Sequence, residues 1–330
     1  MHKKIFFISA ILILFILGCT GGTGRKTSDV DFHVGFNGLS MEFLKNSPPA
    51  KVFEGDTLPV LLKVKNSGAY SIKDDKVIVS LGVEKDYTDK LELLKGGRIS
   101  PFAGLDNAAA FSLEGKSPIN QVGDEEIISY NIKTGKVDPQ SEAHSSAVIA
   151  TLCYPYETTS SSNVCIDTDV NNLRPAKKVC SLQDLTFGSG QGAPVAVTRV
   201  EVNMLPTQTN EKIKPQFLIY VENRGTGSVI RTEAVSSFCT RSDTSHENLN
   251  IVYVNVFLSA KPLKCQLDTG RNGDELGHIK LKDKKDIIFC ALEEGLPVSQ
   301  DPYLSPLKIE LSYGYTQSIS ANYFIQKTAR

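Results

Sequence analysis

Apolar and polar residues alternate along much of this chain in short runs bounded by Gly, Pro, Asn and Asp, which is typical of half-buried β-strands. One such run, Leu61-Leu62-Lys63-Val64-Lys65-Asn66-Ser67-Gly68, is matched 157 residues later by Leu218-Ile219-Tyr220-Val221-Glu222-Asn223-Arg224-Gly225. In both copies a strand leads into Asn-x-Gly, which is expected to supply the positive φ angles of a tight turn. A second match, between Leu152–Thr158 and Leu311–Thr316, has an offset of 159 residues. Because the spacing between the two matches is kept, the pattern predicts a duplicated domain.

The strands expected from this pattern fall into two groups. In a first domain, residues 30–167, they are 41–44, 57–66, 76–81, 109–113, 126–132 and 146–156, followed by a turn at 158–161 and a return strand ending near residue 167. In a second domain, residues 194–330, they are 195–204, 213–223, 249–259, 263–267 and a closing hairpin of 306–315 with 319–325. Residues 89–94 are expected to form a helical turn, and 174–185 an edge strand within an interdomain segment, 168–193. Short strands with few helical periodicities predict an all-β fold of two tandem antiparallel β-sandwiches.

The first eighteen residues are an export signal rather than part of the fold. Lys3 and Lys4 precede an apolar stretch of thirteen residues, Ile5–Leu17, which is too short to span a bilayer comfortably. Ile16-Leu17-Gly18-Cys19 resembles the lipobox of prokaryotic secreted lipoproteins, and the resemblance implies a lipidated N-terminal Cys19 on a Gly-rich tether, residues 19–29. The alternatives are an uncleaved anchor helix or an ordinary signal peptide with a chance cysteine, and both still export the protein.

Composition indicates a globular protein, since 41% of the residues are apolar and 22% are charged. The formal net charge is -1. Loss of Lys3 and Lys4 with the signal leaves 34 basic and 37 acidic residues. This balance gives no electrostatic reason to expect a nucleic acid as partner, because phosphate binding needs a concentrated excess of Lys and Arg.

The remaining cysteines are even in number, as expected for disulfides in an exported chain; the alternative is a set of buried free thiols. They are Cys153, Cys165, Cys180, Cys239, Cys265 and Cys290. Cys153 and Cys165 stand symmetrically about Thr159, so the expected hairpin would pair them. The other expected pairs are Cys265–Cys290 and Cys180–Cys239. No Cys-x-x-Cys occurs, which argues against a thioredoxin-like redox site and a zinc knuckle.

No set of residues is assembled for catalysis, and we expect no catalytic residue, no cofactor and no metal site. His2, His33, His144, His246 and His278 are scattered, with His144 and His246 in polar, loop-like stretches. The run Gly188–Pro194 has the spacing of neither a nucleophile elbow nor a phosphate-binding loop and is interpreted as a linker. Asp167-Thr168-Asp169-Val170-Asn171 places oxygen ligands at alternate positions, as in calcium loops, but lacks the later Gly and Glu, so we expect a turn.

Tyr154, Tyr156, Tyr313 and Tyr315 form two Tyr-x-Tyr pairs, each with both side chains on one face of a strand. They could form an aromatic platform for a glycan or peptide. Their repetition at one position of both units favours core packing, with buried hydroxyls bonded to a loop as in a tyrosine corner.

The arrangement resembles the CARDB-like group of Ig-like adhesion domains, found in surface lipoproteins and secreted proteins of bacteria and archaea. The resemblance rests on Gly55-Asp56, on the strand-turns Val64–Gly68 and Val221–Gly225, and on the closing hairpins; the second unit lacks the Gly-Asp. It implies extracellular adhesion or scaffolding without catalysis.

The hypothesis from sequence is therefore a lipoprotein at the extracytoplasmic face of the cell membrane, held by its N-terminal lipid, with a protein or envelope-polymer partner. The alternative is an accessory subunit of a membrane transport or secretion complex. An envelope-acting hydrolase is less well supported, because no catalytic set is present.

Overall fold

The alternating runs form strands in three sheets of a computed structural model, which describes residues 31–328 except 95, 176, 243 and 269–276. The four-stranded sheet has the order β1 (Leu39–Phe43), β3 (Thr57–Asn66), β8 (Glu125–Thr134), β5 (Thr88–Leu94). The six-stranded sheet has the order β10 (Leu185–Thr186), β11 (Val195–Pro206), β12 (Lys212–Asn223), β18 (Lys285–Ala291), β16 (Lys264–Cys265), with β19 (Leu296–Pro297) beside β12. The fold is thus all-β, as the sequence predicts.

The third sheet contains ten strands and joins the two halves of the chain. Its order is β15 (Lys261–Pro262), β14 (Ile251–Leu258), β20 (Tyr303–Gln326), β9 (Ala143–Ile166), β4 (Ile72–Gly82), β7 (Ala108–Leu113), β6 (Ser100–Pro101). Beside this path, β13 (Ser228–Ile230) and the parallel strand β2 (Lys51–Phe53) pair with β20, and β17 (His278–Lys280) pairs with β14. Short 3₁₀ turns lie at Lys85–Tyr87, Phe102–Gly104, Thr232–Ala234 and His246–Asn248.

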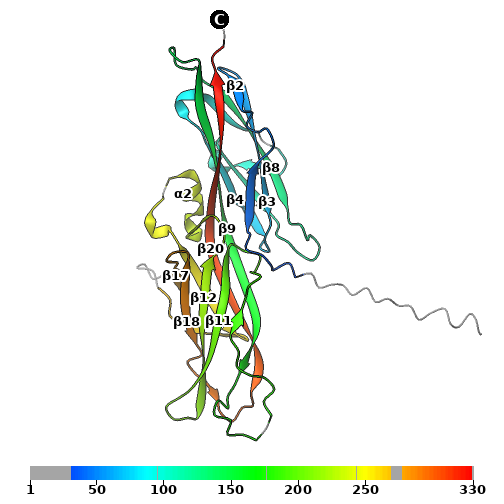
Figure 1. Ribbon diagram of the computed structural model, residues 1–330, viewed down its shortest axis with the longest axis vertical. Helices are drawn as coiled ribbons and strands as arrows, with labels where there is room; N and C mark the ends of the chain where they lie inside the picture. Colours follow the sequence, from blue (N-terminus) through cyan, green and yellow to red (C-terminus); the bar gives the residue numbers. More distant parts are fainter. Residues whose placement is uncertain (1–30, 95, 176, 243, 269–276, 329–330) are drawn as a thin grey trace, which may run out of the picture. The chain divides into compact units, whose positions relative to one another are not determined.

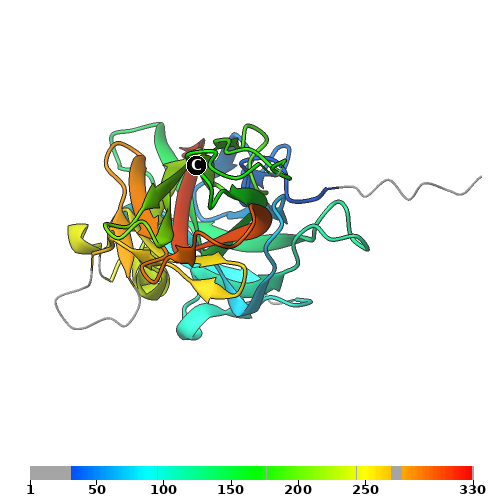
Figure 2. The same cartoon turned by 90° about the horizontal axis from the view of Figure 1, so that it is seen from below.

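β9 and β20 pair along all 24 residues of each strand. At one end of this pair, the four-stranded sheet packs on β9, β20 and their neighbour β4. At the other end, the six-stranded sheet packs on β9, β20 and their neighbour β14 (Figures 1 and 2). The inward-facing side chains of all three sheets belong to one continuous apolar cluster. The two sandwiches therefore share a core and a sheet.

This continuity corrects two predicted hairpins. Residues 158–161 do not turn; they continue β9, with Thr158 and Ser160 buried and Thr159 and Ser161 on the opposite face of the strand. β20 likewise runs straight through residues 316–318, where the closing hairpin of the second unit was expected to turn. Thr and Ser were interpreted as turn residues, but Thr is β-branched and fits the pleated surface of a strand.

Other local predictions also differ from the structure. Residues 89–94 lie in strand β5 and not in a helical turn, because β5 pairs with the edge of β8. Among the described residues of the edge strand expected at 174–185, only Leu185 belongs to a strand, the two-residue β10. The helix α2 (Val235–Thr240) was not predicted, and it packs on β4, β9 and β20. No helix within the described residues is long and apolar enough to cross a membrane.

The disulfides differ from two of the expected pairs. The structure joins Cys153 to Cys239, Cys165 to Cys180, and Cys265 to Cys290. Cys153 and Cys165 cannot pair because they lie on the one extended strand β9, separated by about 40 Å at roughly 3.3 Å per residue. Cys239 is not available to Cys180, because α2 places it on β9 over Cys153. Cys265 and Cys290 are direct cross-strand neighbours in β16 and β18, which is the pair expected from the sequence.

Strands from the segments before and after residue 193 lie side by side in one sheet. Residues after Tyr315 of β20 pair with the part of β9 that packs in the first sandwich, although they belong to the C-terminal segment of the sequence. A division of the chain at residues 193 and 194 therefore separates sequence segments but not sheets. Cys153–Cys239 adds a covalent link between the same two segments.

Candidate binding groove

The register of β9 and β20 brings the two Tyr-x-Tyr motifs directly opposite each other. Tyr313 faces Tyr156 and Tyr315 faces Tyr154, with Gly314 opposite Pro155 at the centre of the ladder. The four rings are almost completely buried, and neighbouring ring centroids are 5.7–6.5 Å apart. The repeated motifs thus meet where the two halves join.

In the first half, the hydroxyl of Tyr156 holds the loop that follows β3. It accepts a hydrogen bond from the backbone N–H of Tyr70 at 3.2 Å and donates one to the carbonyl of Gly192 at 3.0 Å. Asn66 closes the same loop, because its Oδ1 accepts from the N–H of Gly68 and its Nδ2 donates to the carbonyl of Tyr70. The buried side chain of Asn66 and the buried hydroxyl of Tyr156 therefore both have partners in this loop.

The second half repeats this network at equivalent positions. The hydroxyl of Tyr315 accepts from the N–H of Gly227 at 2.7 Å, and Asn223 bonds to the N–H of Gly225 and the carbonyl of Gly227. Neither Gly68 nor Gly225 has a positive φ, in contrast to the expectation for Asn-x-Gly. A Cβ at Gly68 would instead collide with the hydroxyl of Tyr156, and one at Gly225 with that of Tyr315. Glycine is needed there for close approach of the tyrosine.

The tyrosines therefore act as core residues that anchor loops, which confirms the tyrosine-corner prediction and leaves no exposed aromatic platform. Burial raises the pKa of Tyr315 to about 12 and raises the pKa values of Tyr154 and Tyr313 well above the ordinary tyrosine value. The cause is that an apolar environment disfavours the charged phenolate. The cluster is held in its neutral form at ordinary pH.

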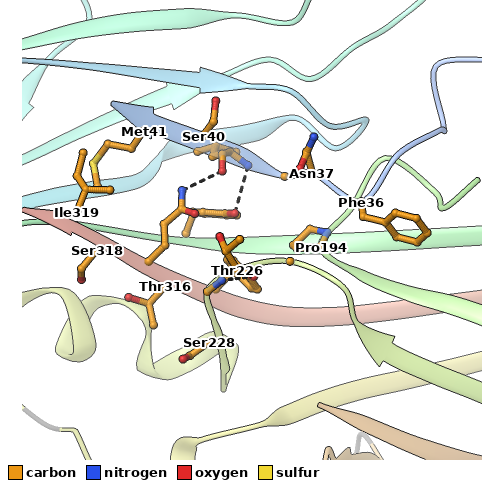
Figure 3. A pocket seen from close by; sticks show the side chains of 17 residues that line it. Phe36, Asn37, Ser40, Met41, Pro194, Thr226, Ser228, Thr316, Ser318 and Ile319 are labelled. Carbon is orange, nitrogen blue, oxygen red and sulfur yellow. Dashed lines mark hydrogen bonds between the residues drawn. The ribbon is translucent and has the colours of Figure 1, made fainter. Parts of the chain in front are cut away.

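A groove with a volume of about 500 Å³ lies beside this cluster. Its walls come from the segment 36–41 at the start of β1, the segment 225–228 that leads into β13, and residues 316–319 of β20, with Pro194 between them (Figure 3). Arg224 stands at the rim, where its guanidinium carbon is 5.0 Å from the ring centroid of Phe36. Two segments far apart in the sequence thus form one surface.

Among the residues that the structure describes, those lining the groove are largely polar and include no charged side chain. Hydroxyls and amides come from Asn37, Ser40, Thr226, Ser228, Thr316, Gln317 and Ser318, and apolar surface comes from Phe36, Met41, Pro194 and Ile319. Gln317 spans the groove and donates from Nε2 to the carbonyl of Leu39 at 2.9 Å. This lining suits a neutral ligand that forms hydrogen bonds, because an unpaired charge buried there would lose its hydration.

The aspartates of the suspected calcium loop are already occupied by protein groups. Asp169 accepts from the backbone N–H groups of Leu173 and Arg174, and Asp167 forms a 2.6 Å ion pair with Lys178. Backbone hydrogen bonds, first that from Leu173, lower the pKa of Asp169. These carboxylates form a turn, as expected. Among the described residues, no three His, Cys, Asp or Glu side chains are grouped as a metal would require.

The structure keeps the histidines that it describes apart. His144 lies in β9 and not in a loop, stacked on Tyr87 and 2.9 Å from Glu84. His246 lies in a 3₁₀ turn, and His278 is buried in β17. His2, the signal residues 1–18, Cys19 and the tether 19–29 lie outside the described residues.

Sequence reasoning missed the groove residues. The nearest signal is the second Asn-x-Gly, because the loop after it carries Thr226 and Ser228 into the groove. Nothing in the sequence shows that β1 and β20 would meet there, since that depends on the register of the central ladder.

No protein-family model matches the chain, and no curated protein sequence matches it. Among solved structures, the chain is similar to the partial N-terminal region of an enterococcal surface protein, with 8% identity, a TM-score of 0.21, and coverage of 86% of this chain and 93% of that one. It is also similar to the C-terminal domain of the antigen I/II-family protein AspA of Streptococcus pyogenes, with 7% identity, a TM-score of 0.21, and coverage of 89% and 98%. Similarity at this level assigns neither a fold family nor a function.

Proposed function

We propose that this chain is a non-catalytic adhesion, scaffolding or binding module at the extracytoplasmic face of a membrane, anchored through a lipid on Cys19. The observation that carries the proposal is the uncharged groove between β1 and β20, an accessible surface built from exposed and half-buried polar residues. We also propose that the chain is related to CARDB-like adhesion domains and that it is exported by the signal that ends at Gly18-Cys19. The proposal keeps a first domain of residues 30–167, an interdomain segment of residues 168–193 and a second domain of residues 194–330.

The surroundings of the groove support a binding role, since its walls are well fixed. The Tyr154 hydroxyl accepts from the N–H of Leu39, and Tyr315 holds Gly227 on the opposite wall. Both tyrosines are fixed by the central ladder, so the walls are pre-organised, which lowers the entropy lost on binding.

The test uses the full chain, with its own leader, displayed on a prokaryotic host. We expect the cells to adhere to protein-coated surfaces or to isolated envelope polymer, and Cys19→Ala to release the protein from the membrane. Thr226→Arg places a long charged side chain in the groove and should reduce adhesion at least about tenfold.

The matched control is Thr209→Arg, which makes the same change in an exposed turn between β11 and β12. It should leave adhesion unchanged. Equal adhesion by cells with and without the chain, or equal loss in both variants, would contradict the proposed function.

A further inference from the structure

We propose that the groove binds an extended, uncharged segment of a partner polypeptide, which adds to the edge of β20 as a further strand. The inference rests on the proposed binding function and names the chemistry of the partner.

The edge of β20 that faces away from β9 has an open stretch between two paired stretches. β13 pairs with residues 314–316 and β2 with residues 324–326. Within the described residues, no strand pairs with Gln317–Tyr323 on that side. The groove lies along the beginning of this gap.

Two hydrogen bonds show which backbone groups face the gap. The N–H of Ser259 bonds to the carbonyl of Pro306, and the N–H of Phe324 bonds to the carbonyl of Ala50, so even-numbered residues of β20 direct their backbone groups away from β9. In an antiparallel strand this direction alternates along the chain. Ser318, Ser320 and Asn322 therefore present their N–H and C=O groups to the gap, and all three residues are exposed.

The opposite wall is also a strand edge. Among the described strands, β1 pairs only with β3, on one side. On its other side, the backbone of Leu39 bonds to the Tyr154 hydroxyl and to Gln317 Nε2. These two side chains supply the hydrogen bonds that a neighbouring strand would otherwise make. Beyond them, Met41 directs its backbone groups to the same side by the same alternation. The beginning of the gap, where Met41 and Ile319 line the groove, is thus bordered by two strand edges.

These features favour a polypeptide over a glycan. Unpaired amide and carbonyl groups that repeat every second residue match the spacing of another strand, and added strands are bound through such groups. The groove carries no charged side chain, which favours a neutral segment. A second copy of this chain fits less well, because its own β20 edge is recessed in the same way between β13 and β2.

The test compares two substitutions at one exposed position. Ser320→Pro removes the N–H that faces the gap and places the proline ring there, while the hydrogen bonds to β9, made by Ile319 and Ala321, remain. Ser320→Ala removes only the hydroxyl. The probe is a phage-displayed library of uncharged peptides of roughly nine residues, long enough to cover Gln317–Tyr323, selected on the intact chain and resynthesised for measurement of Kd.

We expect selected peptides to bind the wild type and Ser320→Ala with Kd values within about twofold, and Ser320→Pro at least about tenfold more weakly. They should also slow amide hydrogen exchange at Ser318, Ser320 and Asn322 in the wild type, a readout that does not depend on the proline variant folding.

Several results would overturn the inference. They are the absence of binding peptides, binding without slowed exchange at these amides, and equal losses in both variants, which would indicate hydroxyl recognition as by a glycan. Concentration-dependent dimers abolished by Ser320→Pro would instead assign the edge to a second copy. Adhesion that Thr226→Arg removes and Ser320→Pro leaves intact would retain the proposed function but refute strand addition.

Discussion

Thr158 of β9 and Gln317 of β20 occupy equivalent positions in the two halves of the molecule, but they produce opposite results. Thr158 Oγ1 donates to the carbonyl of Val195 at 2.6 Å, and Gln317 Nε2 donates to the carbonyl of Leu39 at 2.9 Å. Thr158 is 1% exposed, whereas Gln317 is only half-buried.

The difference lies in side-chain length. The short Thr158 side chain holds Val195 against the ladder, and its hydroxyl is also 3.0 Å from that of Tyr313. The longer amide of Gln317 makes the same kind of bond across a wider space, which is the groove. A duplicated scaffold can thus keep one copy closed and use the other for binding by changing one side chain at the junction.

The largest expected effect tests whether the halves fold together. Val64 and Val221 are fully buried at equivalent positions of β3 and β12. A buried, unpaired carboxylate at either site should cost more than about 5 kcal/mol. Because one core spans both sandwiches, Val64→Asp and Val221→Asp should each unfold the whole described chain in one thermal transition. Ile287→Asp, at a site that is 53% exposed in β18, is the control. Survival of one half as a separate transition would refute the shared core.

Next in size is the loss of the bond between the halves. By loop entropy, Cys153–Cys239, with a sequence separation of 86, should stabilise the fold by about 4–5 kcal/mol, and Cys165–Cys180, with a separation of 15, by about 3 kcal/mol. Replacing both cysteines of each pair with Ser should give this order in chemical denaturation. The reverse order would show that α2 contributes little to holding the halves together.

Alkaline pH should loosen the tyrosine cluster. Burial raises the pKa of Tyr315 to about 12, above the ordinary value of 10.0. The folded chain therefore holds this proton more tightly than the unfolded chain, and stability is fully present below about pH 10 and falls as the pH rises toward 12. The loss due to Tyr315 should reach about 2 kcal/mol, and phenolate absorbance should rise together with unfolding. Tyr315→Phe should reduce the decrease of stability with rising pH. If the decrease is unchanged in this variant, a group other than Tyr315 causes it.

The smallest effect on stability should come from Gln317→Thr, which is one of two reciprocal exchanges of the junction residues. Gln317→Thr loses one partly exposed hydrogen bond, at a cost of about 1 kcal/mol, and should weaken peptide binding because Leu39 is no longer held across the groove. Thr158→Gln forces a longer side chain into a filled site and should cost about 1–3 kcal/mol. Denaturation and peptide titration of both variants check the pair. If both variants lose the same folding free energy and bind the peptide as the wild type does, side-chain length is not the cause of the groove.

The sequence repeat predicts the parts of the fold that depend on local alternation. β3 runs from Thr57 to Asn66 as expected, and both Asn-x-Gly loops occupy the same place in their halves. The long strands were missed because hydroxyl residues such as Thr158 are common both in turns and on half-buried strands. Helix α2 is too short to show a helical period.

The groove could not be predicted for a different reason. Its walls meet only because Gly314 lies opposite Pro155, a register set by tertiary packing along the whole of β9 and β20. The predicted pair Cys153–Cys165 failed for the same reason, since a supposed hairpin at Thr159 brought these two cysteines together when the actual strand separates them.

Residue-resolved amide hydrogen exchange on the intact chain without ligand tests the central claim most directly. If β20 is bound to β9 on one side and unpaired on the other, Ser318, Ser320 and Asn322 should exchange rapidly, while Ile319 and Ala321 between them should be protected. Uniform protection from Gln317 to Tyr323 would show that the edge is already covered and would contradict the account.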